Sequence, residues 1–332
     1  MSGKVRGVVA ALMLAALAST VAACGTSSTS AGSTSSGNSN KNITIGFIPG
    51  VTTDPFFISM QAGAQAEAQK LGVTLLWQGA SQYTPSQQTP YVDSMISRKV
   101  SALAIAPTDA TAMIPPIQRA VNAKIPVITV DSTITNKSLL TAEVTADNVQ
   151  GGQAAADILA KQINDKGTVV VLAPTPGITT DNERVQGFEQ EIKKYPNIKF
   201  VGVQYDNEQN TQAATLAQQM ILRYPDLAGI FGTDDTSASG AATGVRSAGK
   251  TGKVQVVAYD AEPAEVTDLQ SGLISALIAQ KPYEEGQLAV QYAYDAATGQ
   301  TSKIQKSTVL PNVTIDKSNL SQNQQWVYKS NA

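Results

Sequence analysis

The stretch of residues 42–70, NITIGFIPGVTTDPFFISMQAGAQAEAQK, decides the fold. Its first part, Ile43–Ile48, is a continuous apolar run of strand length. Its second part, Phe56–Lys70, carries small or apolar residues at a helical spacing of four. A run without polar alternation is typical of a parallel strand that helices cover on both faces. The chain therefore begins as a doubly wound α/β domain.

The same alternation of apolar runs and helical patterns continues along the chain. We expect further strands at residues 73–78, 102–106, 127–130, 168–172, 199–204, 228–231, 254–259 and 275–279. A helical pattern at Arg184–Lys194 is expected to form the first helix of a second domain. The roughly 290 residues from Asn42 onward suffice for two domains, each with its own core. We therefore predict two doubly wound parallel-sheet α/β domains in series.

Two segments indicate where the chain passes between the domains. The first crossing is expected at Ala146–Gly152 and a later one at Gln280–Pro282, after which a helix at Gly286–Ala297 returns to the first domain. This return predicts a hinge of several strands. We assign residues 42–146 and 281–308 to an N-terminal lobe, and residues 147–280 and 309–320 to a C-terminal lobe.

The first 41 residues match an export signal and a tether. A positively charged start precedes the apolar run Val8–Ala18, which is too short to span a bilayer. Val21-Ala22-Ala23 then precedes Cys24, the one cysteine of the chain. This motif resembles the bacterial lipobox, which implies a signal peptide at 1–23 and acylation of Cys24. An incidental cysteine after an ordinary secretory signal is the alternative. Residues 24–41 are expected to form a flexible, lipidated tether outside the cytoplasmic membrane.

The composition excludes several classes of function. The chain has no histidine, which removes Ser-His-Asp and Cys-His pairs and most zinc sites. The formal net charge is -2, and the charges are scattered rather than gathered in a basic stripe. We therefore expect no enzyme, no metal ion, no cofactor and no nucleic-acid partner.

One motif match carries no nucleotide site. Residues 244–251, GVRSAGKT, fit the phosphate-binding loop pattern letter for letter. That loop needs a strand before it and a helix after it. Here a predicted helix at 236–248 comes first and a predicted strand at 254–259 follows, so no helix N-terminus would point at a phosphate.

Polar side chains follow the predicted strands. They are Asp54, Thr108, Asp109, Asp131, Asp234, Asp235, Asp260 and Gln280. Ligands of open parallel sheets bind at the carboxyl ends of the strands, so these residues are candidates. Each acid is equally suited to cap a helix, and Asp54-Pro55 fits an N-cap followed by proline. Capping does not explain Gln280 or the second carboxylate of Asp234-Asp235.

An aromatic pair and an arginine extend the candidate site. Phe56 and Phe57 are adjacent on a helix, so we expect one ring in the core and the other facing a cleft, where it suits a carbohydrate ring. Core packing of both rings is the alternative. Arg184 offers a planar fork for two ligand oxygens, or else forms a surface ion pair with Glu183 or Asp181.

From about Asn42 to Leu320 the chain resembles the periplasmic sugar-binding proteins of the ribose-binding type, the solute receptors of ABC importers. The resemblance is carried by residues 54–57 (DPFF), 107–109 (PTD), 125–128 (IPVI), 147–148 (DN) before 151–152 (GG), Arg184 before 187–188 (GF), and 256–260 (VVAYD) with 279–280 (AQ). It implies the two-lobed fold of a type I periplasmic binding protein. It also implies ligand contacts at Asp54, Phe56, Phe57, Asp131, Arg184, Asp234, Tyr259, Asp260 and Gln280.

The departures from the ribose receptors bear on the ligand. This chain has Ala106 where they have Asn, and Ser132 where they have Arg, while Asp54 replaces a usual amide. Donors are lost and an acceptor is gained. We therefore expect another pentose, a hexose or a sugar alcohol, and not an acid or a phosphate.

The resemblance implies a monomeric, lipid-anchored solute-binding protein that captures a monosaccharide or sugar alcohol by hinge closure and delivers it to a membrane permease. Two alternatives stay open. One is a receptor for a small furanosyl signal, similar to the autoinducer-binding members of the same superfamily. The other is a carbohydrate-active surface enzyme that uses Asp234, Asp235 and Asp260 as acid and base.

Overall fold

The computed structural model describes residues 43–331. The predicted signal peptide, the tether and Cys24 lie outside the described residues. Within residues 43–331, no helix has both the length and the apolar character needed to cross a membrane.

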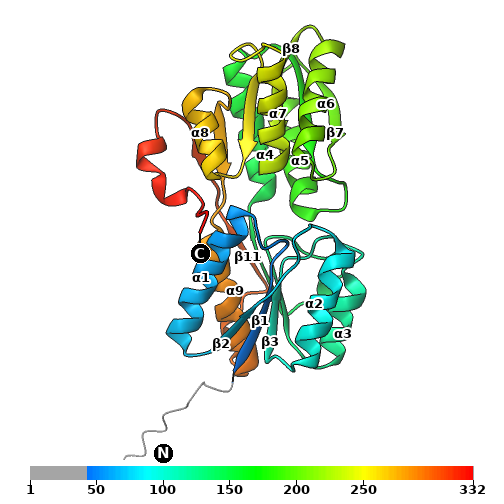
Figure 1. The fold of residues 1–332 in the computed structure, drawn as a ribbon, viewed down its shortest axis with the longest axis vertical. Coiled ribbons are helices and arrows are strands. Elements are labelled where there is room, and N and C mark those ends of the chain that lie inside the picture. The colour runs from blue at the N-terminus through cyan, green and yellow to red at the C-terminus, as the bar shows by residue number, and fades with distance from the viewer. Residues whose placement is uncertain (1–42, 332) are drawn as a thin grey trace, which may run out of the picture. The chain divides into compact units, whose positions relative to one another are not determined.

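The first sheet is parallel throughout, in the strand order β11-β5-β4-β3-β1-β2. Its strands are β1 (Thr44–Ile48), β2 (Thr74–Trp77), β3 (Ala102–Ile105), β4 (Val127–Val130), β5 (Ala142–Ala146) and β11 (Ser307–Leu310). Helices α1 (Pro55–Leu71) and α9 (Pro282–Ala297) pack together on one face. Helices α2 (Pro85–Ser97) and α3 (Ile114–Asn122) cover the other face, as Figure 1 shows.

The second sheet has the order β12-β10-β9-β8-β6-β7, in which only the edge strand β12 is antiparallel. Its strands are β6 (Gly167–Ala173), β7 (Ile198–Tyr205), β8 (Leu227–Gly232), β9 (Gln255–Tyr259), β10 (Ala276–Ala279) and β12 (Val313–Ile315). Helices α4 (Asn148–Gln162) and α5 (Thr179–Ile192) cover one face, and α6 (Asn210–Arg223), α7 (Asp235–Ser247) and α8 (Pro263–Ser271) the other. Short 3₁₀ turns lie at Lys137–Leu139, Thr301–Lys303, Leu320–Gln322 and Gln324–Trp326.

The prediction of two doubly wound parallel-sheet domains is confirmed. All nine predicted strands are present, with ends within one residue of those expected. The strands that the sequence analysis missed are β5, β11 and β12. β5 alternates buried and half-buried residues, and β11 and β12 are short and partly exposed, so none shows a continuous apolar run.

Three connections pass between the two sheets within the described chain. The first is at Asp147, whose side chain caps α4 by accepting from the Gln150 N–H. The second leaves β10 through Gln280 and Lys281 and leads into α9. The third joins β11 to β12 through Pro311 and Asn312.

Two expectations about these boundaries need correction. β11 pairs with β5 as far as Leu310, so residues 309–310 belong to the first sheet and not to the C-terminal lobe. Arg184 does not begin the first helix of the second domain, because α4 precedes α5 and packs on β8, β9 and β10.

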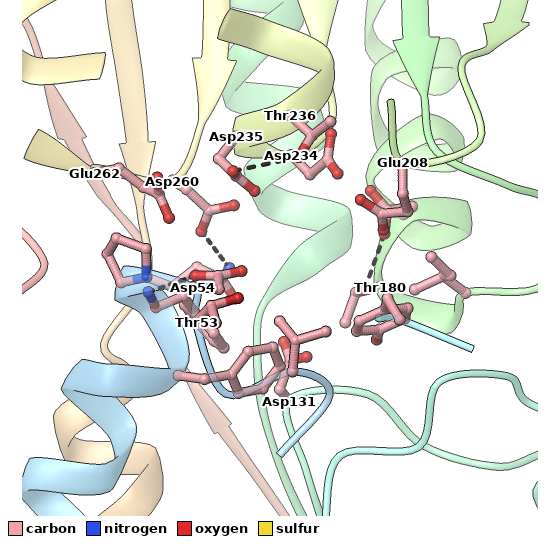
Figure 2. A pocket seen from close by; sticks show the side chains of 18 of the residues that line it. Thr53, Asp54, Asp131, Thr180, Glu208, Asp234, Asp235, Thr236, Asp260 and Glu262 are labelled. Carbon is pink, nitrogen blue, oxygen red and sulfur yellow. Dashed lines mark hydrogen bonds between the residues drawn. The ribbon is translucent and has the colours of Figure 1, made fainter. Parts of the chain in front are cut away.

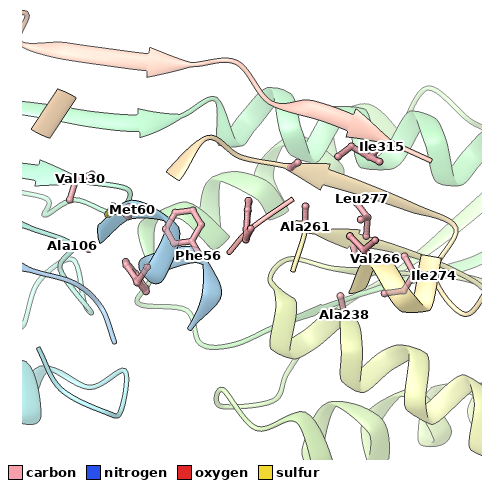
Figure 3. Close-up of a cluster of buried hydrophobic side chains, with 14 of the residues drawn as sticks. Phe56, Met60, Ala106, Val130, Ala238, Ala261, Val266, Ile274, Leu277 and Ile315 are labelled. Carbon is pink, nitrogen blue, oxygen red and sulfur yellow. The ribbon is translucent and has the colours of Figure 1, made fainter. Parts of the chain in front are cut away.

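The largest buried apolar cluster includes side chains of both sheets. Figure 3 shows Phe56 and Met60 of α1 beside Val130 and Ala106, which lie at strand ends of the first sheet. Other members of the cluster, such as Ala238 and Leu277, pack in the second domain. The core therefore continues toward the edge where the strand ends of both sheets meet.

Helices α1 and α9 approach each other through glycines. A Cβ placed on Gly63 would lie 1.9 Å from the Tyr283 carbonyl oxygen, and one placed on Gly286 would lie 2.1 Å from the Met60 carbonyl oxygen. Backbone atoms cannot move aside as a flexible side chain can, so these two positions exclude any larger residue. This contact holds the N-terminus of α1, and with it the loop that carries Asp54, against the start of α9.

We predict that Gly63→Ala lowers the free energy of unfolding by about 1–3 kcal/mol, the usual cost of overpacking. The direction is informative because alanine in a helix interior is otherwise more favourable than glycine by about 1 kcal/mol. Urea unfolding followed by circular dichroism would measure the change. As a control, Gln65→Ala on the exposed side of α1 should stay within about 0.5 kcal/mol of the wild type. A Gly63→Ala protein as stable as the wild type would contradict the close helix contact.

Candidate functional site

A cavity of about 440 Å³ is lined by residues that follow the strands of both sheets. Its volume lies in the roughly 300–1,000 Å³ range of small-molecule sites. Figure 2 shows acidic side chains from the two domains facing one another across this space. Eight of the nine predicted contact residues line it: Asp54, Phe56, Phe57, Asp131, Arg184, Asp234, Asp260 and Gln280.

Asp54 is placed by the start of α1. Its backbone is extended, and its Oδ1 accepts the Phe56 N–H at 2.6 Å, with Pro55 in the first helical turn. The capping role and the site role are therefore compatible, because a carboxylate has a second oxygen. The predicted N-cap at Asp54 is confirmed.

Phe56 and Phe57 do not divide between core and cleft as expected. Both rings are buried in the apolar cluster, in edge-to-face contact with centroids 5.0 Å apart, and both also border the cavity. The pair thus provides an apolar floor on the side of the first domain. Such a surface suits the C–H face of a ligand ring.

Two aspartates at strand ends share an unusual backbone conformation. Asp131 follows β4 with φ 62°, and Asp260 follows β9 with φ 84°. Non-glycine residues adopt positive φ at a cost, and such residues concentrate at functional sites. The Asp131 N–H donates to the Val144 carbonyl, and the Asp260 N–H donates to the Ile278 carbonyl, both at 2.9 Å. Each sheet therefore holds at least one buried carboxylate in the cavity, at the carboxyl end of a strand.

Gln280 follows β10 and lies beside Asp260. Its Nε2 donates to Asp260 Oδ1 at 2.7 Å, while its Oε1 is buried and has no hydrogen-bond partner in the protein. Gln280 lies in the connection from β10 to α9, so this amide joins the site to one of the inter-sheet crossings.

Arg184 is buried and held by several elements. Its Nε donates to Asn148 Oδ1 at 2.9 Å, and its Nη1 donates to the Thr233 carbonyl at 2.8 Å. Nη1 also lies 3.8 Å from Asp181 Oδ1, so the alternative partner Asp181 is present, but in the interior and not on the surface. A fixed guanidinium of this kind is a single buried positive charge at the cavity.

Tyr259 was expected to contact the ligand, but it does not line the cavity. Its side chain is fully buried beneath Arg184, whose guanidinium carbon lies 3.8 Å from the centre of the Tyr259 ring. Tyr259 is the last residue of β9, and its ring packs on the α4–α5 face of the sheet. The ring thus supports Arg184 from behind.

Carboxylates dominate the lining of the cavity. They are Asp54, Asp131, Asp181, Glu208, Asp234, Asp235, Asp260 and Glu262, whereas Arg184 is the only cationic residue among those that line it. Asp54, Asp235 and Glu262 offer oxygens within 4.8 Å of one another. Burial and the neighbouring carboxylates raise the pKa of Glu262 to about 11.

Burial also raises the pKa values of three further acids that line the cavity. The pKa of Asp54 is raised to about 6 and that of Asp131 to about 7, in each case mainly by burial. Asp234, which also caps α7 by accepting from the Ser237 N–H at 2.8 Å, has its pKa raised to about 8 by burial and by Asp181. Burial therefore favours the protonated forms of these groups.

The strand-end candidate Asp235 lines the cavity, whereas several other lining residues were not among the sequence candidates for the site: Tyr83, Thr180, Asp181, Glu208 and Glu262. Tyr83, Glu208 and Glu262 lie in loops after β2, β7 and β9, so the strand-end rule applied to every strand would have found them. Conversely, Asp109 follows a strand but lies outside the lining, where its Oδ1 accepts the Thr111 and Ala112 N–H groups in a turn. For Asp109 the alternative of local capping is the correct one.

Known proteins share this fold and much of this sequence. The chain matches the periplasmic binding protein domain over residues 45–301. A ribose import binding protein of Salmonella typhimurium is 32% identical over 265 residues, which cover 80% of this chain and 88% of the relative.

Two solved structures extend the comparison. An ABC transporter solute-binding protein of Agrobacterium vitis, bound with α-D-tagatopyranose, is 39% identical with a TM-score of 0.84 and covers 86% of this chain and 99% of its own. A carbohydrate transporter solute-binding protein of Agrobacterium radiobacter, in complex with D-arabinose, is 28% identical with a TM-score of 0.81, covering 86% and 98%. These relatives are binding proteins and not enzymes, as the sequence predicts. The chain belongs to the periplasmic binding protein domain family and has the fold of the ABC transporter solute-binding proteins.

Proposed function

We propose that this protein is the extracytoplasmic solute receptor of an ABC importer, which captures a monosaccharide or a sugar alcohol and delivers it to a membrane permease. The observation that carries the proposal is the cavity, because carboxylates from both domains and an apolar floor of two phenylalanines line it together. Relatives named for sugars support the class of ligand. We also propose that the protein is a monomer and that acylated Cys24 anchors it to the membrane.

The cavity offers mainly hydrogen-bond acceptors. Sugar hydroxyls donate to carboxylates, and each bond to a charged group contributes about 1.5–3 kcal/mol. Micromolar affinity requires about 8 kcal/mol, so three or four such bonds and a ring against Phe56 or Phe57 suffice. An anionic ligand would instead face carboxyl oxygens from both domains, and the one cationic residue of the lining, Arg184, already donates to Asn148 and Thr233.

The proposed ligand is a sugar or polyol other than ribose. At two of the three positions where the chain departs from the ribose receptors, Ala106 and Ser132, the side chain does not line the cavity, whereas Asp54 does. Ala106 is fully buried, and Ser132 is buried with its hydroxyl donating to the Pro107 carbonyl at 2.8 Å. No donor side chain therefore replaces the arginine or the asparagine of those receptors at these positions.

Closure of the two lobes is the mechanism we propose. Asp54 and Asp131 belong to the first domain, whereas Arg184, Asp234 and Asp260 belong to the second. A ligand that bonds to both sets favours the closed arrangement over the open one. The lobes would rotate about the three crossings at Asp147, Gln280–Lys281 and Pro311–Asn312, and the permease would bind the closed form.

A thermal-shift screen tests the ligand class. A panel of D-tagatose, D-arabinose, D-allose, myo-inositol, a furanosyl signal, D-gluconate and D-ribose 5-phosphate is expected to give a shift only with neutral sugars or polyols. At 100 times the dissociation constant, the stabilisation would be about 2.7 kcal/mol. A shift with the furanosyl signal alone would support the signal receptor, and a shift with the acid or the phosphate would refute the charge argument.

Within this screen, Asp260→Ala should abolish the shift without loss of the fold, because it removes a carboxylate that lines the cavity. The matched control is Asp93→Ala, an exposed aspartate paired with Arg119 outside the cavity, which should bind as the wild type does. An unchanged affinity in Asp260→Ala would exclude Asp260 from the site.

Hinge closure predicts a smaller radius of gyration on binding. Small-angle X-ray scattering should show this decrease with the ligand identified in the screen, and Asp260→Ala should show none at the same concentration. A wild-type protein that binds the ligand without a change in scattering would contradict closure.

The raised pKa values predict how stability depends on pH. Asp54, Asp131 and Asp234 have higher pKa values in the folded protein than the ordinary value, so the folded state holds these protons more tightly than the unfolded chain. The stability they contribute is fully present below about pH 4 and is lost as the pH rises through about 8. The free energy of unfolding of the ligand-free protein should therefore fall between about pH 5 and about pH 8.

Asp234→Asn should reduce this decrease while keeping an acceptor for the α7 cap. The control is Asp109→Asn, since hydrogen bonds from Thr111 and Ala112 lower the pKa of Asp109 despite partial burial. Because Asp109 titrates only at more acidic pH, that variant should keep the wild-type slope of stability between about pH 5 and about pH 8. Urea unfolding at several pH values measures both, and equal slopes in wild type and Asp234→Asn would contradict the assignment.

A further inference from the structure

The last segment of the chain, Gln324–Lys329, packs behind the cavity and contacts both domains. It follows β12 and lies beyond the region matched by the family, which ends at residue 301. The Tyr328 N–H donates to the Ala261 carbonyl at 3.0 Å in the second domain. The Lys329 N–H donates to Ser59 Oγ at 2.6 Å on α1 of the first domain, beside which Figure 1 shows the last part of the described chain.

The Tyr328 side chain is buried, with 4% of its surface exposed. Its ring packs edge-to-face on Phe56, with centroids 5.6 Å apart. Phe56 itself borders the cavity, so Tyr328 lies one layer behind the apolar floor. Residues 324–329 therefore pack against the site from behind. No local sequence motif indicates this role.

The Tyr328 hydroxyl completes a closed set of hydrogen bonds with Asp260 and Gln280. It donates to Asp260 Oδ1 at 2.9 Å and accepts the Gln280 backbone N–H at 2.9 Å. The Gln280 side chain donates to the same Asp260 Oδ1 at 2.7 Å. Both donors use one oxygen, which leaves Oδ2 of Asp260 for a ligand in the cavity.

Asp260 needs such support because of its backbone. Its φ of 84° is unfavourable for a residue with a side chain, and such a conformation persists only where the surroundings fix it. Gln280 lies at a crossing between the domains and would move with the hinge. Tyr328 is held by Ala261, the residue next to Asp260, and so keeps its position relative to the carboxylate.

We propose that Tyr328 is a positioning residue of the ligand-binding site, which orients the Asp260 carboxylate toward the ligand. The inference rests on the proposed function, because it takes Asp260 as a ligand contact. A hydrogen bond to the charged form favours that form, so Tyr328 lowers the pKa of Asp260 while burial raises it.

The decisive variant is Tyr328→Phe, which keeps the ring against Phe56 and removes only the hydroxyl. For the panel sugar with the largest melting shift, affinity at about pH 8 should fall roughly tenfold, the effect of losing about 1.4 kcal/mol. The acid limb of the affinity–pH profile should move to higher pH, because Asp260 then takes up a proton more readily. The matched control is Tyr283→Phe on α9, which lies outside the cavity lining and should leave both readouts unchanged.

A ligand-free measurement separates this inference from the proposed function. Because Tyr328→Phe raises the folded pKa of Asp260 further, its loss of unfolding free energy should be larger at about pH 8 than at about pH 5. In an Asp260→Asn background the same loss should not depend on pH. A loss that is independent of pH in both backgrounds, or an unshifted affinity profile, would make Tyr328 a packing residue only. A pH-linked loss without any sugar binding would support the Tyr328–Asp260 coupling and refute the sugar receptor.

Discussion

The attraction between the buried Arg184 guanidinium and the carboxylates around it is the interaction on which the rest of the site depends. Arg184 is the only cationic residue that lines a cavity bordered by several carboxylates, and its field opposes the rise in pKa that burial imposes on Asp131, Asp181 and Asp260. A buried guanidinium must itself be satisfied. Asn148 of α4, Thr233 after β8 and the Tyr259 ring at the end of β9 together satisfy it.

The close packing of α4 and α5 makes this arrangement possible. A Cβ on Gly152 would lie 2.0 Å from the Arg184 carbonyl oxygen, and one on Gly187 would lie 2.0 Å from the Val149 carbonyl oxygen. These two glycines let the helix backbones touch, so the Arg184 side chain reaches Asn148 at the start of α4. Sequence positions that carry no chemistry of their own therefore fix the geometry of the charged site.

The sequence predicts the strand ends well, because continuous apolar runs locate parallel strands and their carboxyl ends converge. That rule found Asp131, Asp234, Asp260 and Gln280. Tyr259 was expected in the site only from the resemblance, which does not distinguish a residue that faces the cavity from one behind it. Tyr328 was not predicted because its segment has no helical or strand periodicity and reaches Asp260 only through the tertiary fold. The strands β5, β11 and β12 were not predicted because they include half-buried or exposed residues, so their sequences lack a continuous apolar run.

The charge distribution also explains why closure should require a ligand. Burial already raises the pKa values of Asp54, Asp131, Asp234 and Asp260 in this structure. In the proposed closure, bringing the two pairs together would remove further water from carboxylates that have few donors in the protein. A neutral ligand rich in hydroxyl groups supplies the missing donors from its whole perimeter without adding charge. Under the closure that we propose, the open form would be favoured in the absence of such a ligand and the closed form in its presence, because the ligand would stabilise mainly the state in which both sets of acceptors are within reach.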